Sequence, residues 1–419
     1  MKNNTAQKNI PHGWQEKKLG DVCDIVNGST PKRSVSEYWE NGNIPWFTVD
    51  DIRSNGRIIN KTNQNITDKA LKETSVKLLP EDSVLLCCTA SLGEVALTKI
   101  PLTTNQQFNG LVSKDKKNLF PYYLFYSAQK FGENLKSKSG KTTINFLSVG
   151  SLSKEKVLIP PIKEQQRIAE ILGMVDEDIA KTQEVIEATE KLKHGLMQQL
   201  FIRGIGHTKF KETKIGQIPD EWEVVPVSEV VKKIVDNRGK TPPLALDGIG
   251  MIEVNAIDSS QKYPNYLKIS KYVSQETYNT WFRNGHPEKG DILIPTVGTV
   301  GVAVIMNENK GCIAQNIIAV RVRDTILPDF FYYLVTSPLF VDQIRKVLMG
   351  AVQPSLKVPH MLAFNIPLPT RPEQKEMADI FSAVDEKISV NKKLKARLTL
   401  LKKGLMQDLL SGTVRTITK

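Results

Sequence analysis

The segment Pro160-Pro161-Ile162-Lys163-Glu164-Gln165-Gln166 recurs 209 residues later as Pro369-Thr370-Arg371-Pro372-Glu373-Gln374-Lys375. A repeat of this length is half of the chain, rather than a solenoid unit of about 20–50 residues. Two related halves predict pseudo-two-fold symmetry, which suits a target made of two parts. The same spacing relates two further pairs: Val175-Asp176-Glu177-Asp178-Ile179 to Val384-Asp385-Glu386-Lys387-Ile388, and Gly195-Leu196-Met197-Gln198-Gln199-Leu200 to Gly404-Leu405-Met406-Gln407-Asp408-Leu409.

The repeat also covers the segments that precede these stretches. Ile10-Pro11-His12-Gly13-Trp14 matches Ile218-Pro219-Asp220-Glu221-Trp222, and each opens a segment of mixed character, 13–155 or 221–363. Short β-branched runs bounded by Gly, Pro, Asn and Asp predict strands there, while Pro121 and Pro328 predict helix starts. The two segments diverge in their loops, so we expect two α+β domains with one scaffold and different surfaces. The clearest strands are expected at 84–88, 110–113, 291–295 and 317–322.

Residues 162–201 and 371–410 predict two long helices. Apolar or small residues recur near a 3.5-residue period, and Lys395 interrupts the second stripe where Ile186 stands in the first. A helix of this length is about 60 Å long, so we expect the pair to be antiparallel, each covering the other's stripe; two separate core helices are the alternative. The expected stripes are Ile168, Leu172, Val175, Ile179, Thr182, Ile186, Thr189 and Leu196, and Met377, Phe381, Val384, Ile388, Asn391, Leu398, Leu405 and Leu409.

The predicted domain order follows from these patterns. We expect a first α+β domain at 1–157, a first long helix at 158–206, a second α+β domain at 207–365 and a second long helix at 366–419. The acidic stretches Asp176-Glu177-Asp178 and Asp385-Glu386 are interpreted as a solvated or partner-facing helical surface rather than as a metal site.

Composition favours a polyanionic partner. The chain has 419 residues, and its 57 Lys and Arg exceed its 45 Asp and Glu to give a net charge of +12. A basic surface kept for solubility is the other interpretation of this charge. We expect the four cysteines to be reduced core thiols in a cytoplasmic protein, since no C-x-x-C pair, signal peptide or long apolar run is present.

The sequence offers no catalytic constellation. Gly140-Lys141-Thr142 and Gly239-Lys240-Thr241 lack the first glycine of a phosphate-binding loop, and the five histidines form no zinc-binding cluster. The asparagine-proline-proline-aromatic motif of adenine methyltransferases is also absent. We therefore expect a binding protein without catalytic residues, metal or cofactor of its own.

Polar and basic loop residues are the candidates for binding DNA. Arg and Lys suit phosphates and guanine edges, while Asn and Gln suit adenine. For each residue, ordinary solvation is the alternative, and Gln106 and Gln315 also suit internal hydrogen bonds. The candidates in the first domain are Lys32, Arg33, Arg53, Arg57, Gln106, Gln107, Lys138, Lys141 and Thr142; those in the second are Arg238, Lys240, Asn255, Thr296, Thr299, Gln315, Asn316, Gln353, Ser355 and Lys357.

Taken together, these motifs resemble the DNA specificity subunit of Type I restriction–modification systems. The resemblance rests on the I-P-x-x-W entry, the P-P-x-x-E-Q-x-x-I-A helix start, the V-D-x-x-I stretch and the G-L-M-Q-x-L end, and it covers essentially the whole chain. It implies two target recognition domains that read a bipartite, asymmetric DNA site, held apart by a helical coiled coil. It also implies two modification (methyltransferase) subunits and motor-nuclease restriction subunits as partners. S-adenosylmethionine, ATP and Mg are then expected on those partners.

Two other functions remain open at this point. A self-contained restriction and modification enzyme would carry motifs that are missing here. A coiled-coil scaffold with protein ligands and no role on DNA would show no salt-dependent DNA binding. Four apolar residues fall off the main helical stripes and are expected either to meet the opposite helix or to bind partner subunits: Ile171, Leu192, Ile380 and Leu401.

Overall fold

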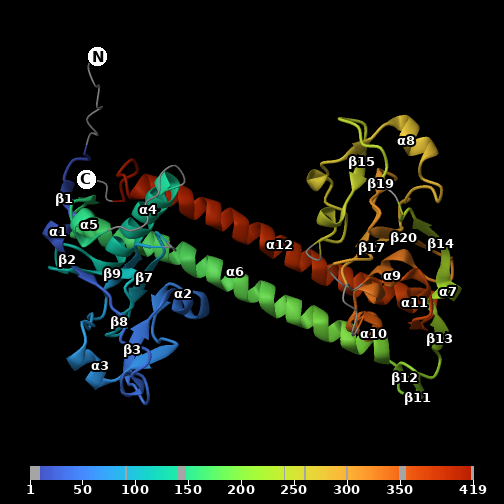
Figure 1. The fold of residues 1–419 in the computed structure, drawn as a ribbon, viewed down its shortest axis with the longest axis horizontal. Helices are drawn as coiled ribbons and strands as arrows, with labels where there is room; N and C mark the ends of the chain where they lie inside the picture. The colour runs from blue at the N-terminus through green and yellow to red at the C-terminus, as the bar shows by residue number, and fades with distance from the viewer. Residues whose placement is uncertain are drawn as a thin grey trace. The chain divides into compact units, whose positions relative to one another are not determined.

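The computed structural model describes residues 10–89, 92–139, 148–239, 241–258, 261–298, 301–348 and 355–416, without the side chains of 134–139. The chain forms two compact units. Unit 1 comprises Met1–Thr182 and Leu394–Lys419, and unit 2 comprises Gln183–Lys393. Each unit combines an α+β domain with part of both long helices, α6 (Ile162–Arg203) and α12 (Arg371–Leu409) (Figure 1). The fold class predicted from the sequence is confirmed.

The α+β domain of unit 1 contains a five-stranded sheet in the order β2-β9-β6-β7-β4, a three-stranded sheet β5-β3-β8 and a two-stranded sheet β1-β10. Helix α4 packs on β6 and β7. The elements are β1 Gln15–Lys18, α1 Leu19–Val22, β2 Cys23–Asn27, η1 Ser36–Tyr38, β3 Ile44–Phe47, α2 Val49–Asn55, β4 Ile58–Ile59, β5 Gln64–Ile66, α3 Asp68–Glu73, β6 Val84–Cys87, β7 Val95–Thr98, β8 Thr103–Thr104, β9 Phe108–Ser113, α4 Pro121–Ser139, α5 Val149–Leu152 and β10 Lys156–Ile159.

The domain of unit 2 repeats this plan with a four-stranded sheet β14-β20-β17-β18, a three-stranded sheet β16-β15-β19 and a two-stranded sheet β13-β21, to which the hairpin β11-β12 is added. The elements are β11 Phe210–Thr213, β12 Gly216–Pro219, β13 Glu223–Pro226, α7 Val227–Val230, β14 Val231–Asp236, β15 Ile249–Ile252, η2 Val254–Ala256, η3 Tyr266–Lys268, β16 Tyr272–Val273, α8 Gln275–Thr280, β17 Ile292–Pro295, β18 Val304–Ile305, β19 Cys312–Ile313, β20 Ile317–Val322, α9 Pro328–Val335, α10 Pro338–Leu348, α11 Val358–Leu362 and β21 Asn365–Leu368.

The clearest strands and helix starts lie where the sequence predicted them. Strands β6, β9, β17 and β20 are the four expected runs, and α4 and α9 begin at Pro121 and Pro328. Proline suits the first helical position because its fixed φ fits the helix and its missing N–H is not needed there. All four cysteines are buried free thiols.

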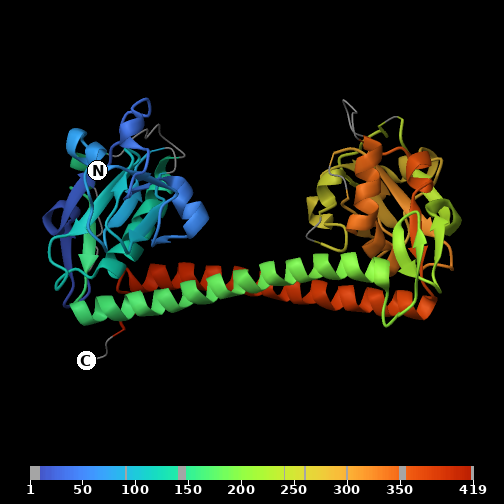
Figure 2. The same ribbon diagram turned by 90° about the horizontal axis from the view of Figure 1, so that it is seen from below.

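Within each unit, one half of α6 pairs with the opposite half of α12. In unit 1, Ile168, Leu172, Met406 and Leu409 share one hydrophobic core, and Lys402 Nζ lies 2.6 Å from Asp176 Oδ1. Residue numbers thus rise along one helix and fall along the other, so the segments are antiparallel. Figure 2 shows that in each unit these segments lie along one side of the α+β domain.

Unit 2 has the same antiparallel pairing, with the roles of the two helices exchanged. Phe201 stacks on Phe381, with ring centroids 5.4 Å apart, and Lys193 Nζ lies 2.6 Å from Asp385 Oδ1. The predicted apolar stripes are the buried faces of the helices. The buried stripe residues are Ile168, Leu172, Thr182, Ile186 and Thr189 on α6, and Met377, Phe381, Ile388 and Leu409 on α12.

The acidic stretches of the helices are only partly surface features. The Tyr126 hydroxyl donates to Asp176 Oδ2 at 3.0 Å, and the Tyr333 hydroxyl donates to Asp385 Oδ2 at 3.0 Å. Each of these aspartates therefore bonds its α+β domain and, through its lysine, the other helix. The interpretation of Asp176 and Asp385 as solvated or partner-facing is wrong, because internal partners take up their carboxylates.

A buried glutamine fastens the start of each long helix to its domain. Gln165 accepts from the backbone N–H of Phe120 at 2.8 Å and donates to the carbonyl oxygens of Asn118 and Pro160, both at 2.8 Å. The side chain is fully buried. Its three hydrogen bonds satisfy backbone groups that would otherwise be buried without partners. Loss of this side chain should therefore lower the free energy of unfolding.

Gln374 repeats this arrangement in unit 2. Its side chain accepts from the N–H of Leu327 at 2.8 Å and donates to the carbonyl oxygens of Thr325 at 3.1 Å and Pro369 at 2.9 Å. The Glu-Gln repeat in the sequence is thus a repeat of the helix-to-domain junction.

The glutamate that precedes each glutamine binds a tryptophan and one further side chain, which is an arginine in unit 1 and a histidine in unit 2. Glu164 accepts from Trp14 Nε1 at 3.0 Å and from Arg415 Nε at 2.8 Å. Although burial favours the neutral acid, the hydrogen bonds from Arg415 and Trp14 outweigh it and hold the pKa of Glu164 below its usual range. Glu373 likewise accepts from Trp222 Nε1 at 2.8 Å and contacts His207 Nε2 at 2.9 Å.

We predict that Gln165→Leu destabilises unit 1, whereas Gln166→Leu does not. Leucine has a similar volume but leaves three buried backbone groups without partners, so the free energy of unfolding should fall by roughly 2–4 kcal/mol. Gln166 is exposed on the same helix, and its replacement should change stability by less than about 0.5 kcal/mol. Urea denaturation, with hydrogen exchange to locate the loss within residues 10–182, measures the difference. Equal stabilities of the two variants would contradict the junction role.

Candidate nucleic-acid interface

The central sheet of unit 1 ends in an edge from which three loops emerge. Asn27, at the end of β2, is in register with Asn109 in β9, and Asn109 is in register with Leu86 in β6. The carboxyl ends of β2 and β6 therefore meet the amino end of β9. We call residues 27–33, 87–89 and 105–109 the loop edge of unit 1.

Contacts between side-chain amides fix this edge, and Asn109 is the buried member of the set. Asn27 Nδ2 donates to Asn109 Oδ1 at 2.9 Å, and Asn109 Nδ2 contacts Cys88 Sγ at 3.1 Å. The Asn105 side chain in turn donates to Gln107 Oε1 at 3.2 Å. These contacts order the starting points of all three loops, and no local sequence pattern indicates the role of Asn109.

The loop after β2 carries Lys32 and Arg33, and hydrogen bonds attach it to the rest of the domain. The Ser29 N–H donates to the Thr104 carbonyl at 2.8 Å, and the Thr30 hydroxyl donates to the Gln106 amide oxygen. The Ser29 and Ser75 hydroxyls are 2.8 Å apart. Lys32, Arg33, Gln106 and Gln107, four of the residues predicted to contact DNA, thus lie on one edge.

Unit 2 has an equivalent loop edge, formed by residues 236–239, 295–298 and 314–318. Asp236 at the end of β14 is in register with Ile318 in β20, which is in register with Ile294 in β17. The Thr296 N–H donates to the Asn316 carbonyl at 2.8 Å, and Leu356 N–H donates to the Thr296 carbonyl at 2.8 Å. Predicted residues from separate parts of the chain therefore converge here: Arg238, Thr296, Gln315, Asn316, Ser355 and Lys357.

The side chains at this second edge are different. Arg238 Nε lies 2.8 Å from Asp236 Oδ1, and Nη2 lies 2.5 Å from Oδ2. These hydrogen bonds from Arg238 hold the pKa of Asp236 below its usual range. Thr296 is buried, and its hydroxyl donates to the Asn316 carbonyl at 3.2 Å, so it shapes the loop from inside. The two units share an edge but present different chemistry on it.

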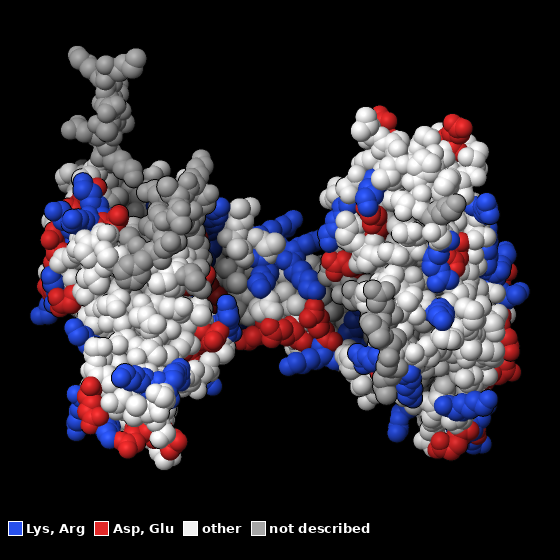
Figure 3. Space-filling model, viewed as in Figure 1, with Lys and Arg blue, Asp and Glu red and all other residues white. Residues whose placement is uncertain are grey.

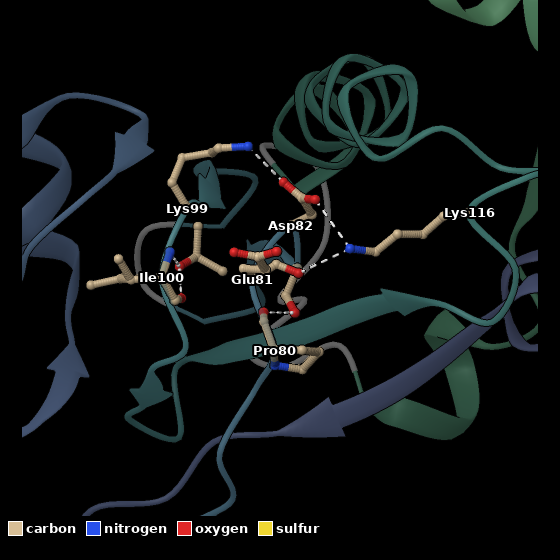
Figure 4. Close-up of polar contacts among 8 residues, drawn as sticks. Pro80, Glu81, Asp82, Lys99, Ile100 and Lys116 are labelled. Atoms are coloured by element: carbon tan, nitrogen blue, oxygen red, sulfur yellow. Dashed lines mark hydrogen bonds and ion pairs between the residues drawn. The ribbon is translucent and has the colours of Figure 1, made fainter.

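Ion pairs lie at the opposite end of each sheet. In unit 1, Asp82 precedes β6 and accepts from Lys99 at 2.8 Å and Lys116 at 3.1 Å (Figure 4). Burial opposes ionisation, but the hydrogen bonds from the two lysines prevail and hold the pKa of Asp82 below its usual range. In unit 2, Arg321 Nε lies 2.9 Å from Asp291 Oδ1. Internal carboxylates thus neutralise cations at this end.

The other predicted residues are spread over the domains. Arg53 pairs with Asp50 at 2.8 Å, and Arg57 pairs with Glu94 at 2.8 Å. Asn255 is exposed and donates to the Lys268 carbonyl at 3.5 Å. The side chain of Lys138, and Lys141, Thr142, Lys240, Thr299 and Gln353, lie outside the described residues.

The four apolar residues predicted off the helical stripes fall into two classes. Ile171 is half-buried and packs against the core of unit 1, and Ile380 is also half-buried. Leu192 and Leu401 are instead 55% and 51% exposed. Two further exposed residues that the sequence reasoning missed, Val185 and Leu394, stand seven positions before them. Seven residues are close to two helical turns, so each pair shares one face.

Charge is mixed over much of the visible surface. On the face of unit 2 shown in Figure 3, Lys and Arg alternate with Asp and Glu. Among the described residues, no helix has the length and apolar character of a membrane span, and no three His, Cys, Asp or Glu side chains form a metal-binding group.

The comparison with protein families explains the duplicated architecture. A model of the Type I restriction modification DNA specificity domain matches the chain twice, over residues 11–190 and 219–400. The chain belongs to this family. It accordingly supplies DNA sequence specificity to a Type I restriction–modification complex, and the two rival functions considered from the sequence are not favoured.

Individual relatives match the chain over nearly its whole length or over one part of it. The MjaVIII specificity subunit of Methanocaldococcus jannaschii is 27% identical over 422 residues, which is 97% of this chain and 94% of that protein. The EcoprrI specificity subunit of Escherichia coli is 38% identical over 179 residues, covering 40% and 42% of the two chains. The solved S subunit of M. genitalium shares the fold, with a TM-score of 0.56, 18% identity and 98% coverage of both chains.

Proposed function

We propose that each loop edge reads one half of a bipartite, asymmetric DNA site. The observation that carries the proposal is the repeated edge itself, in which the same three strand ends meet in both units and present different side chains. Arg33 and Gln106 are exposed in unit 1, and Arg238 and Asn316 are exposed in unit 2. Such groups can bind base edges and phosphates. Because the two units present different sets of these groups, we expect them to recognise different half-site sequences.

The long helices serve, in this proposal, as the spacer between the half-sites. Helices α6 and α12 each run from one unit into the other, and α6, with 42 residues, is about 63 Å long. A paired helix resists bending and compression, which suits a part whose length sets a distance. The same paired helices would form the scaffold on which the modification and restriction subunits assemble in the cytoplasm.

The chemistry is assigned to those subunits. We propose that this chain is non-catalytic and that S-adenosylmethionine, ATP and Mg are bound by the partners. Its contribution to methylation is to hold the target duplex in register while a methyltransferase subunit extracts the base that it modifies.

Domain exchange tests the division of recognition between the units. Residues 221–363 are replaced by the corresponding segment of a relative with a different methylation pattern, and methylated sites are mapped by sequencing cellular DNA. We expect one half of the recognised sequence to change and the other half to persist, because each edge is built within its own domain. Exchange of 13–155 serves as the reciprocal control. A change in both halves, or in neither, would contradict modular recognition.

We further propose that the two exposed apolar pairs seat two modification subunits. Val185 and Leu192 on α6 match Leu394 and Leu401 on α12 at the spacing of the sequence repeat, and all four side chains are at least 40% exposed. A duplicated apolar face implies two equivalent docking sites for copies of one partner. Family membership supplies the partner's class, and the repeat supplies the number of sites.

The docking proposal predicts a stepwise loss of partners. Leu192→Asp should remove one modification subunit from the purified complex, and Leu192→Asp with Leu401→Asp should remove both, since each change puts a charge into an apolar contact. Light scattering gives the mass of each complex. Met174→Asp, at a 49% exposed apolar position of α6 outside the pairs, is the matched control. Full occupancy in the double variant would show that the partners dock elsewhere.

A further inference from the structure

Arg33 lies on a loop that two tryptophans hold in place. Trp46 Nε1 donates to the Ser29 carbonyl at 3.1 Å, and Trp39 Nε1 donates to the Lys32 carbonyl at 3.2 Å. The two indoles meet edge to face, with ring centroids 5.0 Å apart. Trp46 is buried, so its hydrogen bond attaches the loop to the core of the domain.

The guanidinium of Arg33 lies over the rings of this tryptophan pair and is nearest to Trp39. Its Cζ atom lies 3.6 Å from the Trp39 ring centroid and 4.7 Å from that of Trp46. Stacking over an aromatic face immobilises the plane of the group while leaving its N–H donors at the rim. The side chain is exposed, and among the described residues no carboxylate pairs with it.

This environment distinguishes Arg33 from the other arginines predicted to bind DNA. Arg53, Arg57 and Arg238 each form an ion pair with a carboxylate of their own unit. Those carboxylates occupy donors that a base would need and reduce the local positive charge. Arg33 keeps its donors available at no further cost in side-chain ordering, because the stack has already fixed its rotamer.

We propose that Arg33 is a base-reading residue that selects guanine in the half-site recognised by unit 1, with Trp39 and Trp46 as positioning residues. Guanine presents O6 and N7 as neighbouring acceptors in the major groove, and a planar guanidinium matches them with two donors. The ammonium of lysine carries the same charge but no such fork. The inference rests on the proposed function, in which the loop edge reads DNA. It adds that Arg33 is the residue that reads one base, guanine.

The test compares variants of the full chain, each expressed with its modification subunits in cells that lack other methylation, with methylated sites mapped by sequencing. The wild-type half-site of unit 1 should contain one fixed G·C pair that Arg33→Ala and Arg33→Lys both turn into a degenerate position. Preference for guanine should fall about tenfold or more. Trp39→Leu should lower it about two- to fivefold. Lys156→Ala, on the separate sheet β1-β10, should leave the motif unchanged.

Several results would overturn the inference. One is a wild-type half-site without a fixed G·C pair, and another is a uniform fall in methylation at an unchanged motif, which indicates a phosphate contact. Arg33→Ala can leave too little methylation to map. In that case, the Arg33→Lys complex is tested by competition binding to duplexes substituted at each base pair. A preference for guanine equal to that of the wild type in this assay contradicts the proposal. Wild-type methylation that does not depend on this chain would instead refute the proposed function itself.

Discussion

A Glu-Gln pair at the first turn of each long helix holds each unit together, and its glutamine is fully buried in both units. The glutamine satisfies three backbone groups of its domain, and the glutamate binds the tryptophan that opens the same domain. Because these side chains lie within a few residues of the helix start, they fix where the helix leaves the domain and which face it turns inward. Asp176 and Asp385 add a second attachment, each shared between a tyrosine of the domain and a lysine of the other helix.

These fixed junctions free the rest of each domain to vary. The strands that form the loop edge keep their register in both units, while the loops between them differ in length, charge and hydrogen bonding. At the opposite end of the sheets, ion pairs such as Asp82 with Lys99 tie the strands together and consume local charge. The junctions and these ion pairs thus stabilise each domain away from the loop edge, where Arg33, Gln106, Arg238 and Asn316 are exposed.

Much of this architecture was predictable, because a repeat and a helical period are local properties of a sequence. The boundaries of α6 and α12, the strand pattern and the helix starts at Pro121 and Pro328 follow from such signals. The convergence of Thr296, Asn316 and Ser355 depends on sheet register and loop closure, which no local pattern specifies. The stack of Arg33 on Trp39 and Trp46 and the internal roles of Asp176 and Asp385 were hidden for the same reason, since each joins residues that are distant in sequence or in a loop of irregular conformation.

In the proposed function, paired helices set the distance between two independent reading edges, and the spacer of the DNA site measures that distance. A seven-residue helical insertion after Thr182, matched by one after Lys393, preserves the phase of the apolar stripes and adds about 10 Å to each helix. Methylated sites of the altered complex should keep both half-sequences while the spacer between them grows by about three base pairs. An active complex with an unchanged spacer would show that the helices do not set the distance between the half-sites.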